Sequence, residues 1–414
     1  MSTLYYFVNG LDVSKEIQAK SMTANDRITD NPDTAFFVMV DPDNEPFPGN
    51  TVDIYLNDSS QSIFSGIINS ISIQTKSPGM KVYSISCSDY MRYFDRRLVV
   101  EAFATDRTVN QIIQTIVDDY TDPAIGFTTT NVDAPFTLLQ PVVFNYRLPS
   151  EALRELAETI GYFWYIDKDK DIHFKQQELI FASKELNDSL LETKTNQFKI
   201  SVDYNQVRNR IYVRGGYNKS NEITENITQP TGARLWRISY KPHDLSLTVD
   251  GSAKTVGEEN VDSAASFDYL YNFYEKTLIA TGSESTPVRG VIIAMTYKFE
   301  IPLLARVDSH ESQTLITDTE GGDGLYEYVY KDTTLTERAW VFRRAELELQ
   351  KNAWPRIRGS FVTHEFGFNA GESLVVDVTN NTYNGTYIIQ QVTAESLGAS
   401  NMRYQVEFEG QWHG

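Results

Sequence analysis

The chain has 414 residues and a formal net charge of −19 at pH 7, with 41% hydrophobic and 22% charged residues. This composition is that of a globular protein, and the length predicts ~2–4 domains. So acidic a chain lacks the basic surface of a general nucleic-acid binder and is repelled by anionic lipid.

The cysteine content and the apolar runs limit which classes of protein this chain can belong to. Cys87 is the single cysteine, which excludes an internal disulfide or a thiolate metal cluster and fits synthesis in a reducing cytoplasm. The first ten residues, MSTLYYFVNG, lack the basic and apolar regions of a signal peptide. The most apolar internal run, GVIIAMTYKF, is far shorter than the ~20 residues of a membrane-spanning helix. We therefore expect no membrane segment.

Residues 1–98 predict a first small β-barrel domain. Alternating or β-branched runs such as TVDIYL and KVYSISCSDY are separated by turn sequences such as DPDNEPFPGN and KSPGM. The high aromatic content, 12% of the chain, also favours strands.

Residues 99–195 predict a small α/β domain. Apolar residues recur at helical spacing from Val109 to Tyr120. A second helix is expected to begin with Ser150 as its N-cap and to end at Gly161. Two short strands, YFWYI and IHF, follow. We expect the helix to pack an apolar stripe on the sheet that carries Trp164, and the stripe consists of Leu153, Leu156 and Ile160.

Strand patterns return after residue 195. They predict a second, discontinuous β-barrel domain formed by residues 196–240 and 356–414. Residues 241–355 are then an insertion with strands and a terminal helix, which ends before Pro355. The polar stretch 218–232 is expected to be an exposed loop. The predicted fold class is mainly β with an α/β insertion: two similar small β-barrel domains plus a small α/β domain.

The final segment repeats features of the first domain. IINSIS at 67–72 resembles IIQQVT at 388–393, and the spacing from Ile71 to Tyr83 equals that from Val392 to Tyr404. After Gly49 and after Gly371, apolar residues follow at offsets of three, five and seven: Val52, Ile54 and Leu56, and Leu374, Val376 and Val378. Two interpretations stay open. The chain contains a duplicated β domain, or alternating strands align by chance because they share a period of two.

The acidic stretch DKDKDI resembles the start of a calcium loop. Asp167, Asp169, Asp171 and Glu178 fit the acidic positions of an EF-hand. Ile172 occupies the position that needs glycine for the sharp turn, and strands rather than helices flank the acids. We therefore interpret this stretch as a hairpin tip with solvated charges.

The sequence supplies no catalytic, cofactor-binding or metal-binding residues. The histidines are scattered without metal-ligand spacing, at His173, His243, His310, His364 and His413. Cys87 lies in an alternating strand, as a buried structural cysteine does. The glycine-rich loop at 321–326, GGDGLY, lacks the lysine and hydroxyl of a phosphate-binding loop. We expect no enzyme activity.

The order of parts resembles the hub proteins of phage tails and baseplates, a family that includes the late control protein of contractile phages and the hub portion of type VI secretion spikes. The resemblance lies in FSGIINSISI after GNTVDIYL, TVNQIIQTIV, SEALRELAETIGYFWYIDKDKDIHF, NRIYVRGG, and ERAWVFRRAELELQ followed by GESLVVDV. It spans nearly the whole chain and fits least well at 241–330. Some relatives carry a C-terminal peptidase or lysozyme domain, and we expect none here.

The resemblance implies a structural protein of the virion, made in the host cytoplasm and placed at the tail tip or baseplate. It implies a homotrimer whose six β domains adapt a six-fold tail tube to a three-fold tip. The implied partners are tail tube or distal tail ring proteins, a tail-tip spike or fibre protein, and the tape-measure protein. Genomic DNA only passes through the channel during ejection. The alternative is a tail-tip protein that binds or degrades the cell wall.

Overall fold

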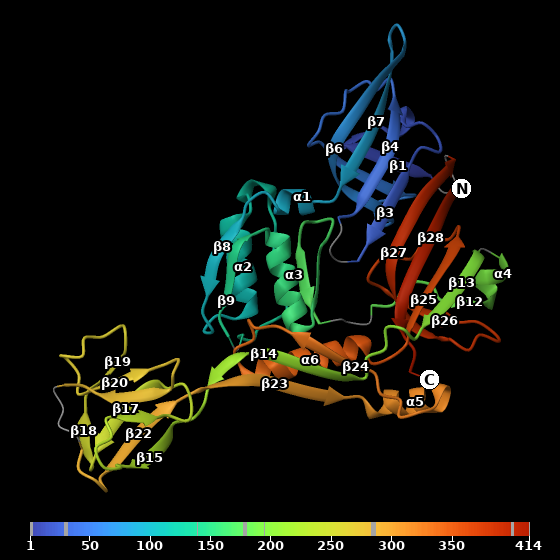
Figure 1. The fold of residues 1–414 in the computed structure, drawn as a ribbon. Helices are drawn as coiled ribbons and strands as arrows, with labels where there is room; N and C mark the ends of the chain where they lie inside the picture. Colours follow the sequence, from blue (N-terminus) through green and yellow to red (C-terminus); the bar gives the residue numbers. More distant parts are fainter. Residues whose placement is uncertain are drawn as a thin grey trace. The chain divides into compact units, whose positions relative to one another are not determined.

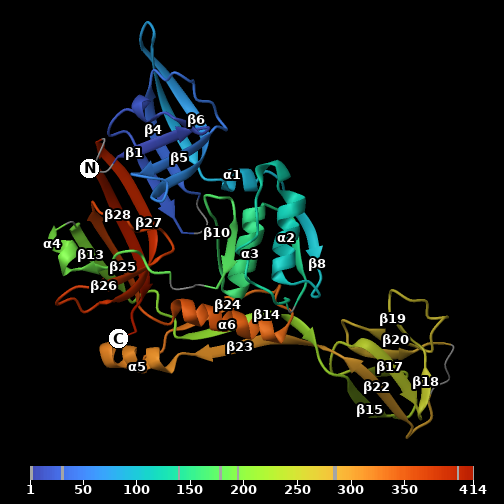
Figure 2. The same ribbon diagram turned by 180° about the vertical axis from the view of Figure 1, so that it is seen from behind.

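A computed structural model of the chain describes residues 3–28, 32–138, 140–176, 180–193, 195–282, 287–398 and 401–413 (Figures 1 and 2). The chain is mainly β and divides into two compact units. Unit 1 comprises Met1–Arg210, Asp308–Glu327 and Glu346–Gly414, and unit 2 comprises Ile211–Val307 and Tyr328–Ala345.

The first β domain is a curled antiparallel sheet in unit 1. Its strands alternate buried and half-buried side chains, as in β5, where Val52, Ile54 and Leu56 are buried. The Gln18 amide donates to the Val38 carbonyl at 2.8 Å, which brings the segment after β2 back to β4. The elements are β1 (Leu4–Val8), β2 (Leu11–Asp12), η1 (Ser14–Glu16), β3 (Thr23–Arg27), β4 (Thr34–Val40), β5 (Thr51–Leu56), β6 (Ser62–Ser77), β7 (Met80–Ser88) and α1 (Met91–Phe94).

A second β domain in unit 1 brings together segments from the middle and the end of the chain. Its elements are β12 (Leu186–Asn187), α4 (Asp188–Thr193), β13 (Thr195–Asp203), β25 (Arg356–Thr363), β26 (Ser373–Asp377), β27 (Gly385–Gly398) and β28 (Asn401–Gln411). The limits differ from those expected. Leu186 is buried in the core of this domain, whereas residues 211–240 lie in unit 2, because the strand after β13 pairs with other partners.

The α/β domain of unit 1 holds both expected helices. Its elements are β8 (Val99–Phe103), α2 (Val109–Tyr120), η2 (Pro123–Ile125), β9 (Val142–Arg147), α3 (Pro149–Ile160), β10 (Phe163–Ile166) and β11 (Ile172–Lys175). The predicted span of α2 is confirmed. Thr108 caps this helix by accepting from the Gln111 amide, while the Gln111 side chain accepts from the Thr108 amide, a reciprocal capping box.

The start of α3 differs from the prediction. Leu148 is the N-cap and Pro149 occupies the first helical turn, where a missing amide costs nothing. Ser150 is therefore inside the helix, and its amide and hydroxyl both donate to Asp95, at 2.9 and 2.6 Å. The end at Gly161 is confirmed, with a left-handed φ of 77°. The predicted apolar stripe is also confirmed, because it and Trp164 on β10 are buried and α3 contacts β10, the stripe being Leu153, Leu156 and Ile160.

Unit 2 is also mostly β. One three-stranded sheet consists of β14 (Arg210–Lys219) between β23 (Glu300–Asp308) and β24 (Glu327–Lys331), and α6 (Arg338–Asn352) begins in this unit. Two four-stranded sheets enclose a separate core that contains Trp236, Tyr269 and Tyr297. Their strands are β15 (Ile223–Thr228), β16 (Leu235–Arg237), β17 (His243–Val249), β18 (Ser252–Lys254), β19 (Val256–Glu258), β20 (Tyr269–Asn272), β21 (Thr277–Ala280) and β22 (Ile292–Lys298).

The loop expected at 218–232 contains a strand. Residues of β15 alternate between half-buried and exposed, and the whole strand pairs with β22. Ile223 and Ile227 pack on the core of unit 2, so this prediction was wrong. Thr224 and Asn226 point outward, whereas Glu225 lies on the inner face and accepts a hydrogen bond from the buried Tyr297 hydroxyl at 2.7 Å. This mixture of polar residues hid a strand of period two.

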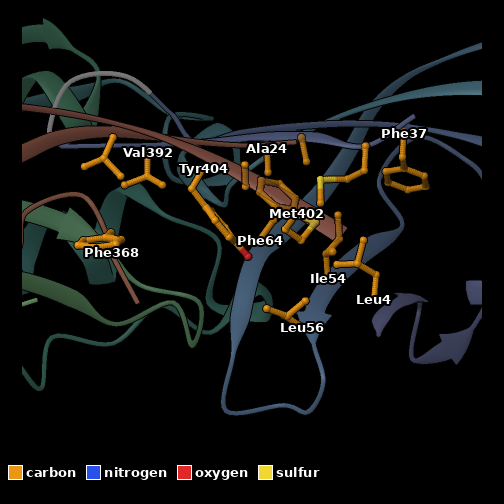
Figure 3. Close-up of a cluster of buried hydrophobic side chains, with 14 of the residues drawn as sticks. Leu4, Ala24, Phe37, Ile54, Leu56, Phe64, Phe368, Val392, Met402 and Tyr404 are labelled. Carbon is orange, nitrogen blue, oxygen red and sulfur yellow. The ribbon is translucent and has the colours of Figure 1, made fainter. Parts of the chain in front are cut away.

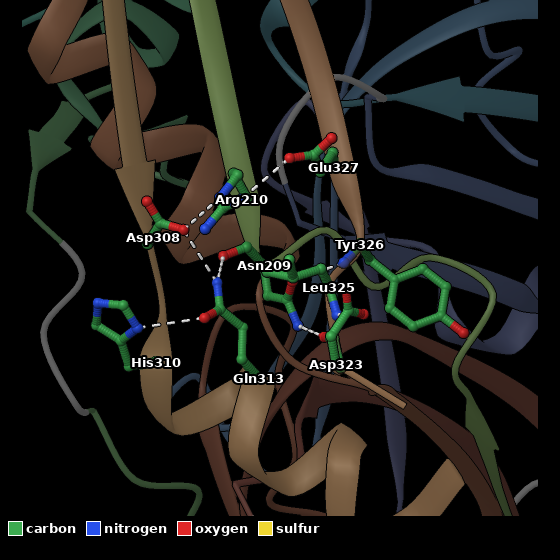
Figure 4. Close-up of polar contacts among 10 residues, drawn as sticks. Asn209, Arg210, Asp308, His310, Gln313, Asp323, Leu325, Tyr326 and Glu327 are labelled. Atoms are coloured by element: carbon green, nitrogen blue, oxygen red, sulfur yellow. Dashed lines mark hydrogen bonds and ion pairs between the residues drawn. The ribbon is translucent and has the colours of Figure 1, made fainter. Parts of the chain in front are cut away.

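A polar network in unit 1 surrounds Asn209, at the point where the chain leaves the unit (Figure 4). The buried Asn209 side chain donates to the Gly324 carbonyl and accepts from the Tyr326 amide, both at 2.8 Å. The neighbouring Arg210 forms ion pairs with Asp308 and Glu327. The network therefore ties together three segments that run into unit 2, next to α5 (His310–Glu320).

Candidate assembly interface

The two β domains have the same internal register. In the first hairpin Ile71 lies opposite Ile85, and in the second Val392 lies opposite Val406. Equivalent residues of the two hairpins are therefore 321 positions apart in the sequence on both strands (392 minus 71, and 406 minus 85). Both hairpins also carry a β-bulge at equivalent places, after Ile68 in β6 and after Ile389 in β27.

A second pair of bulges lies near the hairpin ends. The register shifts between Thr75 and Ser77 in β6 and between Ser396 and Gly398 in β27, again 321 positions apart. A bulge is a specific insertion in a ladder, and alternating sequences do not share bulges by chance. The shared register and bulges therefore favour the interpretation of the repeat as a duplicated β domain.

The flanking strands are equivalent too. Phe37 on β4 lies opposite Ile85, and Phe361 on β25 lies opposite Val406, and both rings are fully buried. The next strand outward is β3 in the first domain and β13 in the second. By the same pairing Ala24 of β3 corresponds to Ile200 of β13, because their partners Ala35 and Gly359 are equivalent.

The two domains are joined edge to edge within the chain. β3 of the first domain pairs antiparallel with β27 of the second, and Ala24 lies opposite Ala394. The Thr393 hydroxyl donates to Asn25 at 2.9 Å, and the Ser396 amide donates to the Met22 carbonyl at 3.0 Å. One sheet therefore runs through both domains.

Buried side chains from both domains form a single core (Figure 3). At the junction, Met22 and Ala24 of the first domain belong to the same cluster as Val392, Ala394 and Met402 of the second. Burial of this apolar surface stabilises the join by the hydrophobic effect. The join is thus built like a domain core rather than like a flexible linker.

Carboxyl groups also meet at this junction. Asp26 on β3 accepts a hydrogen bond from the Ala370 amide at 2.8 Å. Burial, opposed by the Ala370 hydrogen bond and assisted by the nearby Glu372 carboxylate, raises the pKa of Asp26 to about 6. Burial also raises the pKa of Glu372. The junction therefore disfavours ionised carboxylates relative to water, and no local sequence pattern marks where these carboxyls meet.

The acidic stretch lies at the tip of a hairpin, as predicted, but its charges are not all solvated as expected, because Asp171 is buried. β10 pairs antiparallel with β11, Ile166 lies opposite Ile172, and Ile172 is fully buried. Glu178 lies outside the described residues. Asp167, Asp171 and His173 are the three metal-capable side chains that the described part of the chain brings together.

The carboxylate oxygens of this group already accept hydrogen bonds. Asp171 accepts from the Thr130 amide at 2.8 Å and from the Asn131 side-chain amide at 2.7 Å. Asp167 accepts from the Asp171 amide at 2.9 Å and contacts the His173 ring at the same distance. These bonds fix the hairpin to the preceding loop, which is a structural use of the acids.

The other candidate residues lie apart. Cys87 is buried in the shared core, and burial raises the pKa of its thiol to about 12, so the nucleophilic thiolate is disfavoured. The Nδ1 atom of His364 lies 2.6 Å from the Met402 carbonyl. The remaining histidines are on different elements: His173 on β11, His243 on β17, His310 on α5, and His413 near the C-terminus. The loop at 321–326 follows α5.

A cavity of about 350 Å³ lies in unit 1 between α1 and α3. Asp95 at its wall is already bonded to Ser150, and burial raises the pKa of this carboxyl. Arg92, also on the wall, donates to Asn69 at 2.9 Å. These hydrogen bonds connect α1 with α3 and α1 with β6, which is a structural use of the polar groups on the wall.

Comparison with solved structures shows the fold. The 43 kDa tail protein of prophage MuSo2 from Shewanella oneidensis is similar over 99% of this chain and 98% of its own, with a TM-score of 0.60 and 10% identity. A tail protein from Neisseria meningitidis MC58 is similar over 100% and 98%, with a TM-score of 0.57 and 10% identity. Prophage tail protein gp18 from Listeria monocytogenes EGD-e is similar over 98% and 94%, with a TM-score of 0.53 and 12% identity.

The chain therefore has the fold of prophage tail proteins, and the resemblance stated from the sequence is confirmed at that level. No protein-family model and no curated protein sequence matches the chain. Across the described residues, the helices are all too short or too polar to cross a membrane.

Proposed function

We propose that this chain is a structural tail hub of a bacteriophage, with a place at the tail tip or baseplate of the virion. Three copies form a ring that adapts the six-fold tail tube to the three-fold tip or spike. The supporting observation is the duplication: two β domains with equivalent strands and bulges sit in one chain. Three chains then supply six nearly equivalent domains to the tube.

The parts that occur once per chain match the three-fold symmetry of the tip. The α/β domain and unit 2 occur once in each copy. In a trimer they supply three equivalent surfaces, for the spike or fibre protein or for the ring periphery. Tube or distal tail ring proteins contact the six β domains, and the tape-measure protein meets the channel. DNA passes through a lumen that the net charge of −19 helps to keep free of bound polyanion.

The size of the full-length protein in solution tests this proposal. We expect native mass spectrometry to give three chains and electron-microscopy class averages to show a ring with pseudo-six-fold density. A monomer at tens of micromolar, or a ring with another number of chains, overturns the trimeric hub. Incubation with purified cell walls tests the alternative, since release of soluble fragments would show a hydrolase.

A further inference from the structure

Equivalent positions of the two β domains differ greatly in exposure. Ile73 on β6 and Ala394 on β27 are counterparts, 321 positions apart, yet Ile73 is 57% exposed and Ala394 is 5% exposed. The reason is local. β3 covers the edge of β27 at Ala394, whereas β5 pairs with β6 only as far as Ile67.

Among the strand edges of the described residues, two are open at places equivalent to the join between the domains. The first is the second half of β6, from Ser70 to Ser77, which pairs with β7 alone. The second is β13, which is the last strand of its sheet and pairs with β25 alone. These edges are the counterparts of β27 and β3, the two strands that join the domains within the chain.

From these equivalences we infer that β13 of one chain pairs antiparallel with the second half of β6 in the next copy. The contact repeats between chains the join that β3 and β27 make within each chain. It rests on the proposed ring for the number of chains, but its residues come from the internal duplication alone. Open edges of this kind are protected in assemblies by pairing with a neighbour.

The internal join fixes the register of the proposed contact. Asn25 lies opposite Thr393 within the chain. Their counterparts are Ser201 on β13 and Ser72 on β6, so these serines face each other between chains. By the same shift the neighbouring pairs are Ile200 with Ile73, Val202 with Ile71, and Lys199 with Gln74.

The side chains agree with this register. Ile71, Ile200 and Val202 are half-buried against the core of their own domains, so the new pairs extend the apolar face of the sheet. Ser72 and Ser201 are both exposed on the opposite face, where the equivalent Thr393 hydroxyl bonds Asn25. Shifting the register by one residue would place isoleucine opposite serine throughout. No like charges meet in these pairs, and no proline interrupts them.

Disulfide cross-linking in the full chain tests the contact. We would make Ser72→Cys with Ser201→Cys and leave Cys87 in place, because it is buried. Directly opposed residues in antiparallel strands have Cβ atoms about 5 Å apart, which is close to disulfide geometry. Mild oxidation should convert most of the protein to a covalent trimer that dithiothreitol reverses. Each single variant should remain uncross-linked.

The matched control moves one cysteine by one residue. Ser72→Cys with Val202→Cys places the thiols on opposite faces of the sheet, and we expect cross-linking to fall at least ~5-fold. A trimer by native mass spectrometry that does not cross-link through residues 72 and 201 overturns this contact and leaves the hub standing. A covalent ladder beyond three chains supports the contact but overturns the trimeric ring.

A second variant needs no cysteine. Ile73→Lys places a charge where the contact would bury an isoleucine. We expect the variant ring to need a ~10-fold higher protein concentration than the parent ring to stay assembled. Leu11→Lys is the control, because Leu11 is similarly exposed, at 53%, in the same domain but on β2. Thermal midpoints of the dissociated chains separate misfolding from lost assembly. Equal dissociation of both variants overturns the inference.

Discussion

Gly49 and Gly371 hold the same place in the two β domains and the same hydrogen bond. Each amide donates at 2.8 Å to the carbonyl of an isoleucine, Ile68 for Gly49 and Ile389 for Gly371. Both glycines have a left-handed backbone, with φ of 93° and 86°. The turn that starts the strand before each hairpin has thus been kept in both copies, and its backbone demands glycine.

Gly371→Ala should destabilise the protein by ~1–2 kcal/mol through backbone strain alone. A Cβ atom added there meets nothing within 4 Å, so steric overlap is not a cause. Urea unfolding measures the loss. Gly385→Ala on β27 is the control, because its added Cβ would meet only ordinary contacts, the nearest at 3.6 Å. Equal losses at both positions would show that the left-handed turn is not what requires glycine.

Asn209→Ala should cost ~2–4 kcal/mol, because it leaves the Gly324 carbonyl and the Tyr326 amide without their side-chain partner. The loss should also make the segments around Arg210 more sensitive to limited proteolysis. The control is Asn205→Ala, since Asn205 is exposed. If both variants unfold at the same urea concentration as the parent protein, the network does not anchor these segments.

Local sequence signals explain which elements could be predicted. The helix at Val109–Tyr120 has a complete capping box and a fully apolar buried face, so its limits followed from nearby residues. The hairpin around the acidic tip and the hairpins of the two repeats could be predicted for the same reason, because each strand pairs with the strand next to it in the sequence. Period and capping suffice when an element and its partner lie close along the chain.

Elements with distant partners escaped prediction. β3, with the polar sequence TANDR, pairs with β27 more than 360 residues later. Nothing near Thr23–Arg27 indicates a strand or a join between domains. The helix α5 has only two buried residues, Ser312 and Ile316, and therefore no apolar stripe to detect. Once the duplication is known, however, the equivalence of β3 and β13 indicates which strand edges can pair: β13 and the second half of β6.

Acidification should stabilise the protein between pH 7 and pH 5. Burial raises the pKa of Asp26 to about 6, from an ordinary value of 3.8. Burial raises the pKa of Asp89 to about 6 as well. The folded protein therefore binds these protons at pH values where the unfolded chain has lost them, and stability rises as pH falls through 6.

Urea midpoints at pH 7 and pH 5 measure this effect. We expect a gain of about 1–2 kcal/mol from Asp26, and Asp26→Asn should remove that part of the pH dependence. Asp58→Asn is the control, because Asp58 is fully exposed and hydrogen bonds from Ser60 lower its pKa. A stability that falls between pH 7 and pH 5 in the parent protein would contradict the raised pKa values.

Calcium should leave the thermal midpoint unchanged. The oxygens of Asp167 and Asp171 already accept hydrogen bonds from the backbone and from Asn131, so binding an ion would first require breaking them. A ligand that binds the folded state tightly must raise the midpoint. Melts with 1 mM calcium and with chelator, at the same ionic strength, should therefore overlay. Asp171→Asn should lower both curves equally, because it weakens the bonds to Thr130 and Asn131 whether or not calcium is present. A rise of several degrees with calcium, lost in Asp171→Asn, would show that the hairpin is a metal site after all.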